Sequence, residues 1–143
     1  MNPPSPFALV VLILCLSFAS FPAKAAPPAA GDARNIVGVW KGGMPGEPPG
    51  SMELTITPER ITGRNPRNGE SLGEGSYQLD PARKTIDVVR VEKFGRGRTY
   101  VGLYSLEGGT LKWVSNSRGK QRPKDLRHRP ERDQFLMVLE RQK

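Results

Sequence analysis

The chain has 143 residues, with 22 Lys and Arg against 14 Asp and Glu, and a formal net charge of +8. This length predicts a single domain. The one cysteine excludes an intramolecular disulfide, so the stability of the fold must come from a packed core. The excess of positive charge favours an anionic partner, although the same charge also serves solubility.

An apolar run over residues 7–21 precedes Pro22 and the small-residue site Ala23-Lys24-Ala25. The run is shorter than the roughly 20 residues that span a bilayer, and the pattern is typical of a signal peptide over residues 1–25. A retained anchor is the alternative. Cys15 follows Leu14 inside the run, so we interpret it as part of the signal core and not as a lipidation site.

Cleavage after Ala25 would leave 118 residues without cysteine and, after the loss of Lys24, a net charge of +7. Thiol catalysis and thiolate zinc sites are then excluded. We expect a periplasmic or secreted protein, for which an acidic polysaccharide or a lipid headgroup surface is a more suitable anionic partner than nucleic acid.

Residues 26–34 are rich in Ala, Pro and Gly without apolar periodicity, which predicts a flexible tether. The folded domain is predicted over residues 35–143, where short β-like runs alternate with Gly, Pro and Asn and no helical stripe occurs. The predicted strands are residues 36–41, 51–57, 60–63, 72–79, 85–93, 98–106, 110–115 and 134–141.

Most of these strands alternate between apolar and polar residues, but residues 85–93 change phase. Ile86 and Val88 share one face, whereas Val89 and Val91 share the other. A β-bulge or burial on both faces would explain the change. Sequential strands with short connections favour an antiparallel up-and-down barrel of about eight strands, which leaves no exposed edge. A two-sheet β-sandwich is the alternative.

A basic segment of eighteen residues, 116–133, separates the last two predicted strands. Connections of this length are uncommon in small domains and are often functional. Its cations are candidate contacts for an anionic partner: Arg118, Lys120, Arg122, Lys124, Arg127, Arg129 and Arg132. A second basic turn, Gly95-Arg96-Gly97-Arg98, would extend this surface if both segments lie at the same end of the barrel.

The sequence gives little support to an enzyme. Its single histidine, His128, lies between arginines in the basic segment, which is typical of a solvated loop residue, and no G-x-S-x-G, H-E-x-x-H, P-loop or EF-hand pattern is present. No catalytic residue, metal site or cofactor is therefore predicted. A barrel of eight strands is either filled by its own side chains or holds one small ligand. The residues predicted to line such a cavity are Met52, Leu54, Tyr77, Phe135 and Met137.

Five further segments are informative when taken together: residues 38–41, 75–81, 101–112, 122–123 and 136–141. They resemble a family of uncharacterised, usually exported domains that is named after the Planctomycetes. The resemblance to this family implies no activity, substrate or catalytic residue.

The first predicted strand contains Gly38-Val39-Trp40, and the last contains Arg141. This arrangement is loosely similar to lipocalin-like barrels, which carry Gly-x-Trp in the first strand and a basic residue in the last strand that packs on the indole. Arg141 shares its strand face with apolar residues, so stacking on Trp40 would suit it and would close the barrel. Alternatively, Arg141 extends into solvent.

The sequence thus predicts an all-β, non-enzymatic binding module outside the cytoplasm. The first hypothesis is contact with an anionic partner through residues 116–133. The alternative is a lipocalin-like carrier of a small hydrophobic ligand in the barrel interior.

Overall fold

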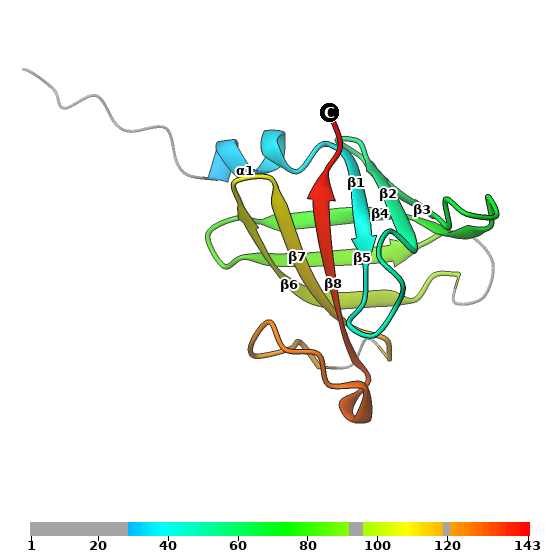
Figure 1. Ribbon diagram of the computed structural model, residues 1–143. Coiled ribbons are helices and arrows are strands. Elements are labelled where there is room, and N and C mark those ends of the chain that lie inside the picture. The colour runs from blue at the N-terminus through cyan, green and yellow to red at the C-terminus, as the bar shows by residue number, and fades with distance from the viewer. Residues whose placement is uncertain (1–28, 92–95, 119–120) are drawn as a thin grey trace, which may run out of the picture.

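The computed structural model describes residues 29–91, 96–118 and 121–143, which form a closed antiparallel barrel of eight strands in sequence order (Figure 1). The predicted up-and-down barrel is confirmed, and the two-sheet alternative is wrong. The strands are β1 (Gly38–Gly43), β2 (Met52–Ile56), β3 (Arg60–Arg64), β4 (Ser71–Asp80), β5 (Thr85–Arg90), β6 (Thr99–Glu107), β7 (Thr110–Asn116) and β8 (Gln134–Arg141).

The barrel closes where β1 pairs with β8, with Trp40 directly opposite Arg141. The expected contact between these two side chains is present, because Arg141 Cζ lies 4.3 Å from the centroid of the indole. The guanidinium also donates hydrogen bonds to the carbonyl oxygens of Val37, at 3.0 Å, and Asn35. A Cβ at residue 38 would lie 2.6 Å from Arg141 Nη1, and Gly38 has a φ of +147°. Glycine at this position therefore makes room for the cation that covers Trp40.

An up-and-down barrel places alternate connections at opposite ends. The connections β1–β2, β3–β4, β5–β6 and β7–β8 share one end, which we call the mouth. The other end, with the short turns and helix α1 (Ala29–Asn35), we call the plugged end. Figure 1 shows residues 121–133, between β7 and β8, below the barrel and away from α1 and the C-terminus. The two basic segments therefore share the mouth, although part of each lies outside the described residues.

Helix α1 differs from the flexible tether predicted for residues 26–34. It is anchored by Asp32, whose carboxylate accepts hydrogen bonds from Lys84 Nζ at 2.5 Å and from the Tyr104 hydroxyl at 2.7 Å. Ile36, just after the helix, is completely buried, and its carbonyl accepts a hydrogen bond from Trp40 Nε1 at 2.8 Å. The two contacts of Asp32 join the helix to residues 52 and 72 positions further along the chain, and for that reason composition alone gives no sign of them.

The change of phase in β5 has a different cause from either predicted one. The register of β5 is continuous with both β4 and β6, so the strand contains no bulge. Ile86 is buried, whereas Val89 is 38% exposed and Val91 is 37% exposed. Val89 and Val91 therefore lie on the outer face of the barrel, in contact with water. The irregular register is found between β3 and β4, at Gly63 and Arg64.

The packed core fills the plugged half of the barrel. Its fully buried members are Ile36, just after α1, and residues at the strand ends nearest α1, which include Trp40, Ile56, Ile86, Tyr104, Leu111 and Leu139. The mouth half of the interior is lined mostly by partly exposed residues and by glycine, with the buried Leu54, Ile61 and Trp113 among them. This unequal filling determines where a ligand has room.

Candidate functional site

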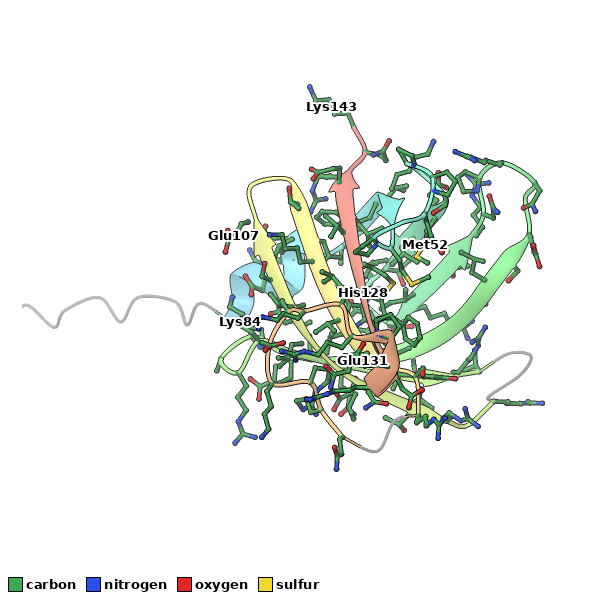
Figure 2. The ribbon with its side chains drawn as sticks, turned by 60° about the horizontal axis from the view of Figure 1, so that its bottom comes forward. Met52, Lys84, Glu107, His128, Glu131 and Lys143 are labelled. Carbon is green, nitrogen blue, oxygen red and sulfur yellow. The ribbon has the colours of Figure 1, made fainter. Side chains whose placement is uncertain are left out.

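A cavity of about 210 Å³ occupies the mouth half of the barrel interior and opens to solvent. Its lining comes from β2 to β8 and is mostly apolar, with Leu54 and Ile61 deepest, towards the packed core. The other lining residues are Met52, Gly63, Leu72, Gly73, Glu74, Gly75, Val88, Arg90, Tyr100, Trp113, Ser115 and Met137. Figure 2 shows the molecule with its lower end turned forward and labels Met52 within the barrel.

The cavity exists because inward positions of β3 and β4 carry glycine. Gly63 pairs with Gly73 across these strands, and Gly75 follows at the next inward position of β4. Where another barrel would place three side chains, this one has only backbone. A Cβ on Gly75 would lie 2.7 Å from Val88 Cγ1, and a Cβ on Gly73 would collide with the guanidinium of Arg90. The glycines thus leave space both for the cavity and for the arginine that borders it.

Among the described residues that line the cavity, Arg90 is the cation. Its Nη2 donates a hydrogen bond to the carbonyl of Leu72 at 2.6 Å, and the guanidinium lies over the Cα of Gly73. Its Nε is buried and has no hydrogen-bond partner within the described part of the chain. The indole nitrogen of Trp113, a residue only 6% exposed, is likewise unpartnered there. Buried donors without acceptors destabilise a fold unless a ligand or water satisfies them.

Three of the five predicted cavity residues, Met52, Leu54 and Met137, line the cavity. Tyr77 and Phe135 do not. Tyr77 packs against the core, where burial raises the pKa of its hydroxyl, and that hydroxyl donates to the carbonyl of Thr57 at 2.8 Å. Phe135 meets the edge of the His128 ring, with centroids 6.0 Å apart. Both side chains follow the predicted alternation along their strands, and each pairs with a residue that lines the cavity, Val88 and Ser115, but Tyr77 packs on the core and Phe135 on His128 instead.

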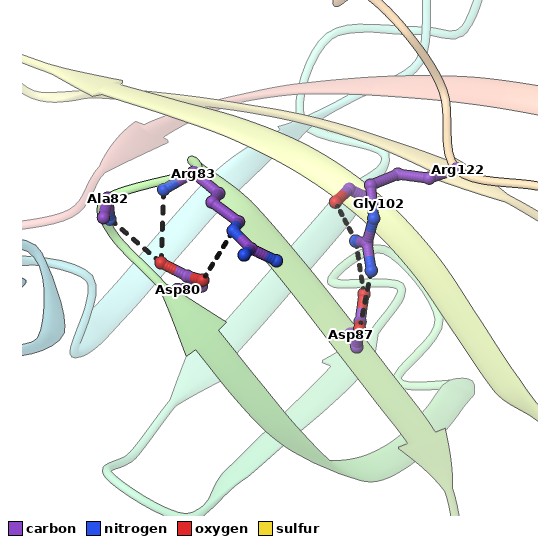
Figure 3. A network of polar contacts seen from close by, with 6 residues as sticks. All are labelled: Asp80, Ala82, Arg83, Asp87, Gly102 and Arg122. Carbon is purple, nitrogen blue, oxygen red and sulfur yellow. Dashed lines mark hydrogen bonds and ion pairs between the residues drawn. The ribbon is translucent and has the colours of Figure 1, made fainter.

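Arg122, one of the predicted anion contacts, is used to attach the basic segment to the barrel wall (Figure 3). Its Nη1 and Nη2 donate to the two carboxylate oxygens of Asp87 at 2.5 and 2.9 Å, and Nη1 also donates to the carbonyl of Gly102 at 2.8 Å. The hydrogen bonds to Asp87 raise the pKa of Arg122. The neighbouring Pro123 is fully buried. This end of the segment is therefore fixed in place.

Other cations of the segment also have carboxylate partners. Both terminal nitrogens of Arg129 donate to Asp125 at 2.8 Å, and this hydrogen bonding lowers the pKa of Asp125. Arg118 pairs with Asp133 at 2.9 Å, and Arg127 reaches Asp125 only at 3.8 Å. Much of the predicted anion-binding charge is thus neutralised internally.

Lys124 and Arg132 are the exposed cations of the segment for which the described residues supply no ion pair. Arg127, 74% exposed at its side chain, is held only loosely. Lys120 lies outside the described residues. Across the mouth, Arg96 and Arg98 on the β5–β6 connection are exposed as well.

His128 is not the solvated loop residue that the sequence suggests. Its Nδ1 accepts a hydrogen bond from the backbone N–H of Leu136 at 3.2 Å, and its ring packs on Phe135. Figure 2 labels it over the barrel, next to β8. The ring thereby fastens the far end of the segment to the last strand.

Within residues 29–91, 96–118 and 121–143, no three His, Cys, Asp or Glu side chains lie close enough together to hold a metal ion. No helix in the same ranges has the length and apolar character needed to cross a membrane. The predicted signal peptide, residues 1–25, lies outside the described residues.

Comparison of the chain with models of known protein families gives no match, and comparison with curated proteins gives none either. The interpretation of the site therefore depends on its geometry alone.

Sequence reasoning missed Arg90 and the inward glycines. The alternation of Tyr77 and Leu79, continued backwards along β4, places Gly75 and Gly73 on the same inner face. That signal was available. Arg90 was concealed because the apolar Val89 and Val91 on the outer face made the strand seem to change phase, and a charge is not expected inside a barrel.

Proposed function

We propose that the protein is a non-enzymatic binding module that acts outside the cytoplasm and holds one small, mostly apolar molecule in the mouth half of its barrel. The observation that carries the proposal is the open apolar cavity of about 210 Å³, set above a fully packed core. Its location outside the cytoplasm rests on residues 7–25, and membership of the Planctomycetes-type family rests on the resemblance alone.

The size of the cavity limits the ligand. An apolar protein cavity of about 150 Å³ accommodates benzene, and drug-sized ligands occupy pockets above about 300 Å³. A volume of about 210 Å³ lies between these values and fits a molecule of roughly six to ten non-hydrogen atoms.

Binding of neutral 1-octanol or 1-hexanol to the purified protein tests this proposal by calorimetry and by the fluorescence of Trp113 in the cavity wall. A Trp113→Phe control identifies the signal of that indole. We expect saturable binding at one site, and Ser115→Phe, which adds an aromatic ring to the lining, should abolish it while the circular dichroism spectrum stays unchanged. Absence of binding, or binding that Ser115→Phe leaves intact, would reject a ligand in the cavity.

A second candidate function is contact with an anionic surface at the mouth. It is favoured by the position of both basic segments at one end of the barrel and by the exposed, weakly paired Lys124, Arg127 and Arg132. Neutralising these three together should weaken retention on heparin or on anionic vesicles. The matched control neutralises three cations away from the mouth, Arg34, Arg83 and Lys112. Equal losses in the two triple variants would indicate a general effect of charge and reject a mouth-specific surface.

Arg122 and Arg129 are unsuitable for that test. Each holds a carboxylate through two hydrogen bonds, so replacing either would alter the conformation of the segment together with its charge.

A further inference from the structure

We propose that the natural ligand of the cavity is a small amphiphilic carboxylate, with its anionic group held by Arg90 near the mouth and its apolar group directed towards Leu54 and Ile61. This inference depends on the proposed function, since it names the chemical class of the molecule that occupies the same cavity. Three observations support it.

The first is unbalanced charge. Among the described residues that line the cavity, Arg90 is the one cation and Glu74 the one acid. The Glu74 carboxylate is paired with Arg60, whose own side chain is 62% exposed. Within the described ranges, Arg90 has no carboxylate partner and only the carbonyl of Leu72 as acceptor. A cation in an apolar lining without a counter-ion favours an anionic ligand.

The second observation is the unused hydrogen-bonding capacity of the guanidinium. An arginine carries five N–H donors in a planar fork that matches the two oxygens of a carboxylate. Arg90 uses Nη2 on Leu72, while its Nε is buried and unpartnered in the described structure. A small rotation of the guanidinium towards the cavity would present this donor to a carboxylate.

The third observation is that the lining of the cavity changes along the barrel axis, from a charged group at the mouth to apolar side chains at the floor. Arg90 ends β5 at the mouth and lies over Gly73, near the start of β4. The floor is formed by Leu54 and Ile61, each only 5% exposed. A ligand with one charged end and one apolar end matches this arrangement, with its charged end near solvent. Neither an alcohol nor a hydrocarbon satisfies Arg90 to the same degree.

Octanoate and 1-octanol are the two probes, because they share a chain of eight carbons and differ in the head group. Calorimetry on the purified protein should give an affinity for octanoate at least about tenfold higher than for 1-octanol, which is the usual range for a charge-assisted hydrogen bond. Arg90→Gln should remove that preference and leave 1-octanol within about twofold. Arg90→Lys, which keeps the charge without the planar fork, should be intermediate.

The matched control is Arg96→Gln, which removes the same charge from the mouth at an exposed position that does not line the cavity. It should leave the octanoate preference within about twofold. If Arg96→Gln lowers octanoate affinity as much as Arg90→Gln, the anion is attracted by the mouth as a whole, and the assignment to Arg90 is wrong.

The remaining outcomes separate this inference from the proposed function. Equal affinities of the unaltered protein for octanoate and 1-octanol would overturn the carboxylate assignment while a ligand cavity stands. Failure of both probes to bind would overturn the cavity function and this inference together. If Arg90→Gln does not fold, the ratio of the two affinities in the unaltered protein decides by itself.

Discussion

The plugged half and the mouth half of the barrel are built from the same eight strands and differ in what points inward. In the plugged half, Trp40, Tyr104 and Leu139 are at most 1% exposed, and α1 covers the end through Asp32 and Ile36. In the mouth half, inward positions carry glycine at Gly63 and Gly73, and the cavity remains between partly exposed side chains.

The two halves therefore have different roles: the plugged half stabilises the fold, and the mouth half has room for a ligand. A closed barrel leaves no strand edge whichever residues fill it, so its backbone persists where side chains are missing. Packing at one end then stabilises the whole sheet, and the other end is free to hold a ligand. The following predictions test that division, from the largest expected effect to the smallest.

The sharpest comparison lies on one face of β8. Leu139 is fully buried in the plugged half, whereas Met137, two residues earlier, borders the cavity. Leu139→Ala should lower the free energy of unfolding by about 3 kcal/mol, and Met137→Ala by about 1 kcal/mol, because the second site already adjoins empty space. Urea denaturation measures both. Equal losses would show that the two halves contribute similarly to stability.

Arg141 joins the first and last strands of the plugged half. Arg141→Ala removes the stacking on Trp40 and two hydrogen bonds to backbone carbonyls. We expect a loss of about 1 to 2 kcal/mol in the free energy of unfolding and a change in Trp40 fluorescence. Arg60→Ala, on an exposed surface pair, is the control and should cost less. Unchanged stability and fluorescence in Arg141→Ala would contradict a role in closing the barrel.

The attachment of α1 should depend on pH. Burial acts to raise the pKa of Asp32, but hydrogen bonds from Lys84 and Tyr104 and the charge of Lys84 outweigh it, so the pKa is lowered from its ordinary 3.8. The ionised carboxylate therefore stabilises the fold above that value, and this contribution is lost as the pH falls through the lowered pKa.

Asp32→Asn should accordingly lower the free energy of unfolding by about 1 kcal/mol at pH 7. The difference in this free energy between the variant and the unaltered protein should shrink steadily as the solution is acidified below pH 3.8. Urea denaturation at several pH values measures it. Tyr104→Phe removes one of the two donors and should reproduce part of the loss at pH 7. A deficit that is the same at every pH would mean that the charge of Asp32 is irrelevant.

The smallest expected effect on stability is found in the mouth half. Ser115→Phe places a ring in space that is now empty, so it should raise the free energy of unfolding by up to about 1 kcal/mol. The same substitution should abolish ligand binding. A strong destabilisation would show that the cavity is too small or too rigid for an aromatic ring, in conflict with the proposed size of the ligand.

The sequence by itself determined the strand pattern and favoured a closed barrel over a two-sheet sandwich. Both follow from alternation along each strand and from turn residues between the strands, which are local signals. The contact between Trp40 and Arg141 was one of two possibilities for Arg141, suggested by the apolar face of its strand and by the similarity to lipocalin-like barrels. Three of the five cavity residues, Met52, Leu54 and Met137, were predictable for the same reason.

Only the tertiary structure decided which end of the barrel is hollow, because that depends on which inward side chains pack against one another in space. Tyr77 and Phe135 point inward and still miss the cavity. The structure likewise revealed that Arg122 is bound to Asp87, 35 residues away, while Arg90 lies in the cavity wall without a carboxylate partner in the described part of the chain. Sequence shows that an arginine is charged, but its neighbours in space determine whether that charge remains available for a ligand.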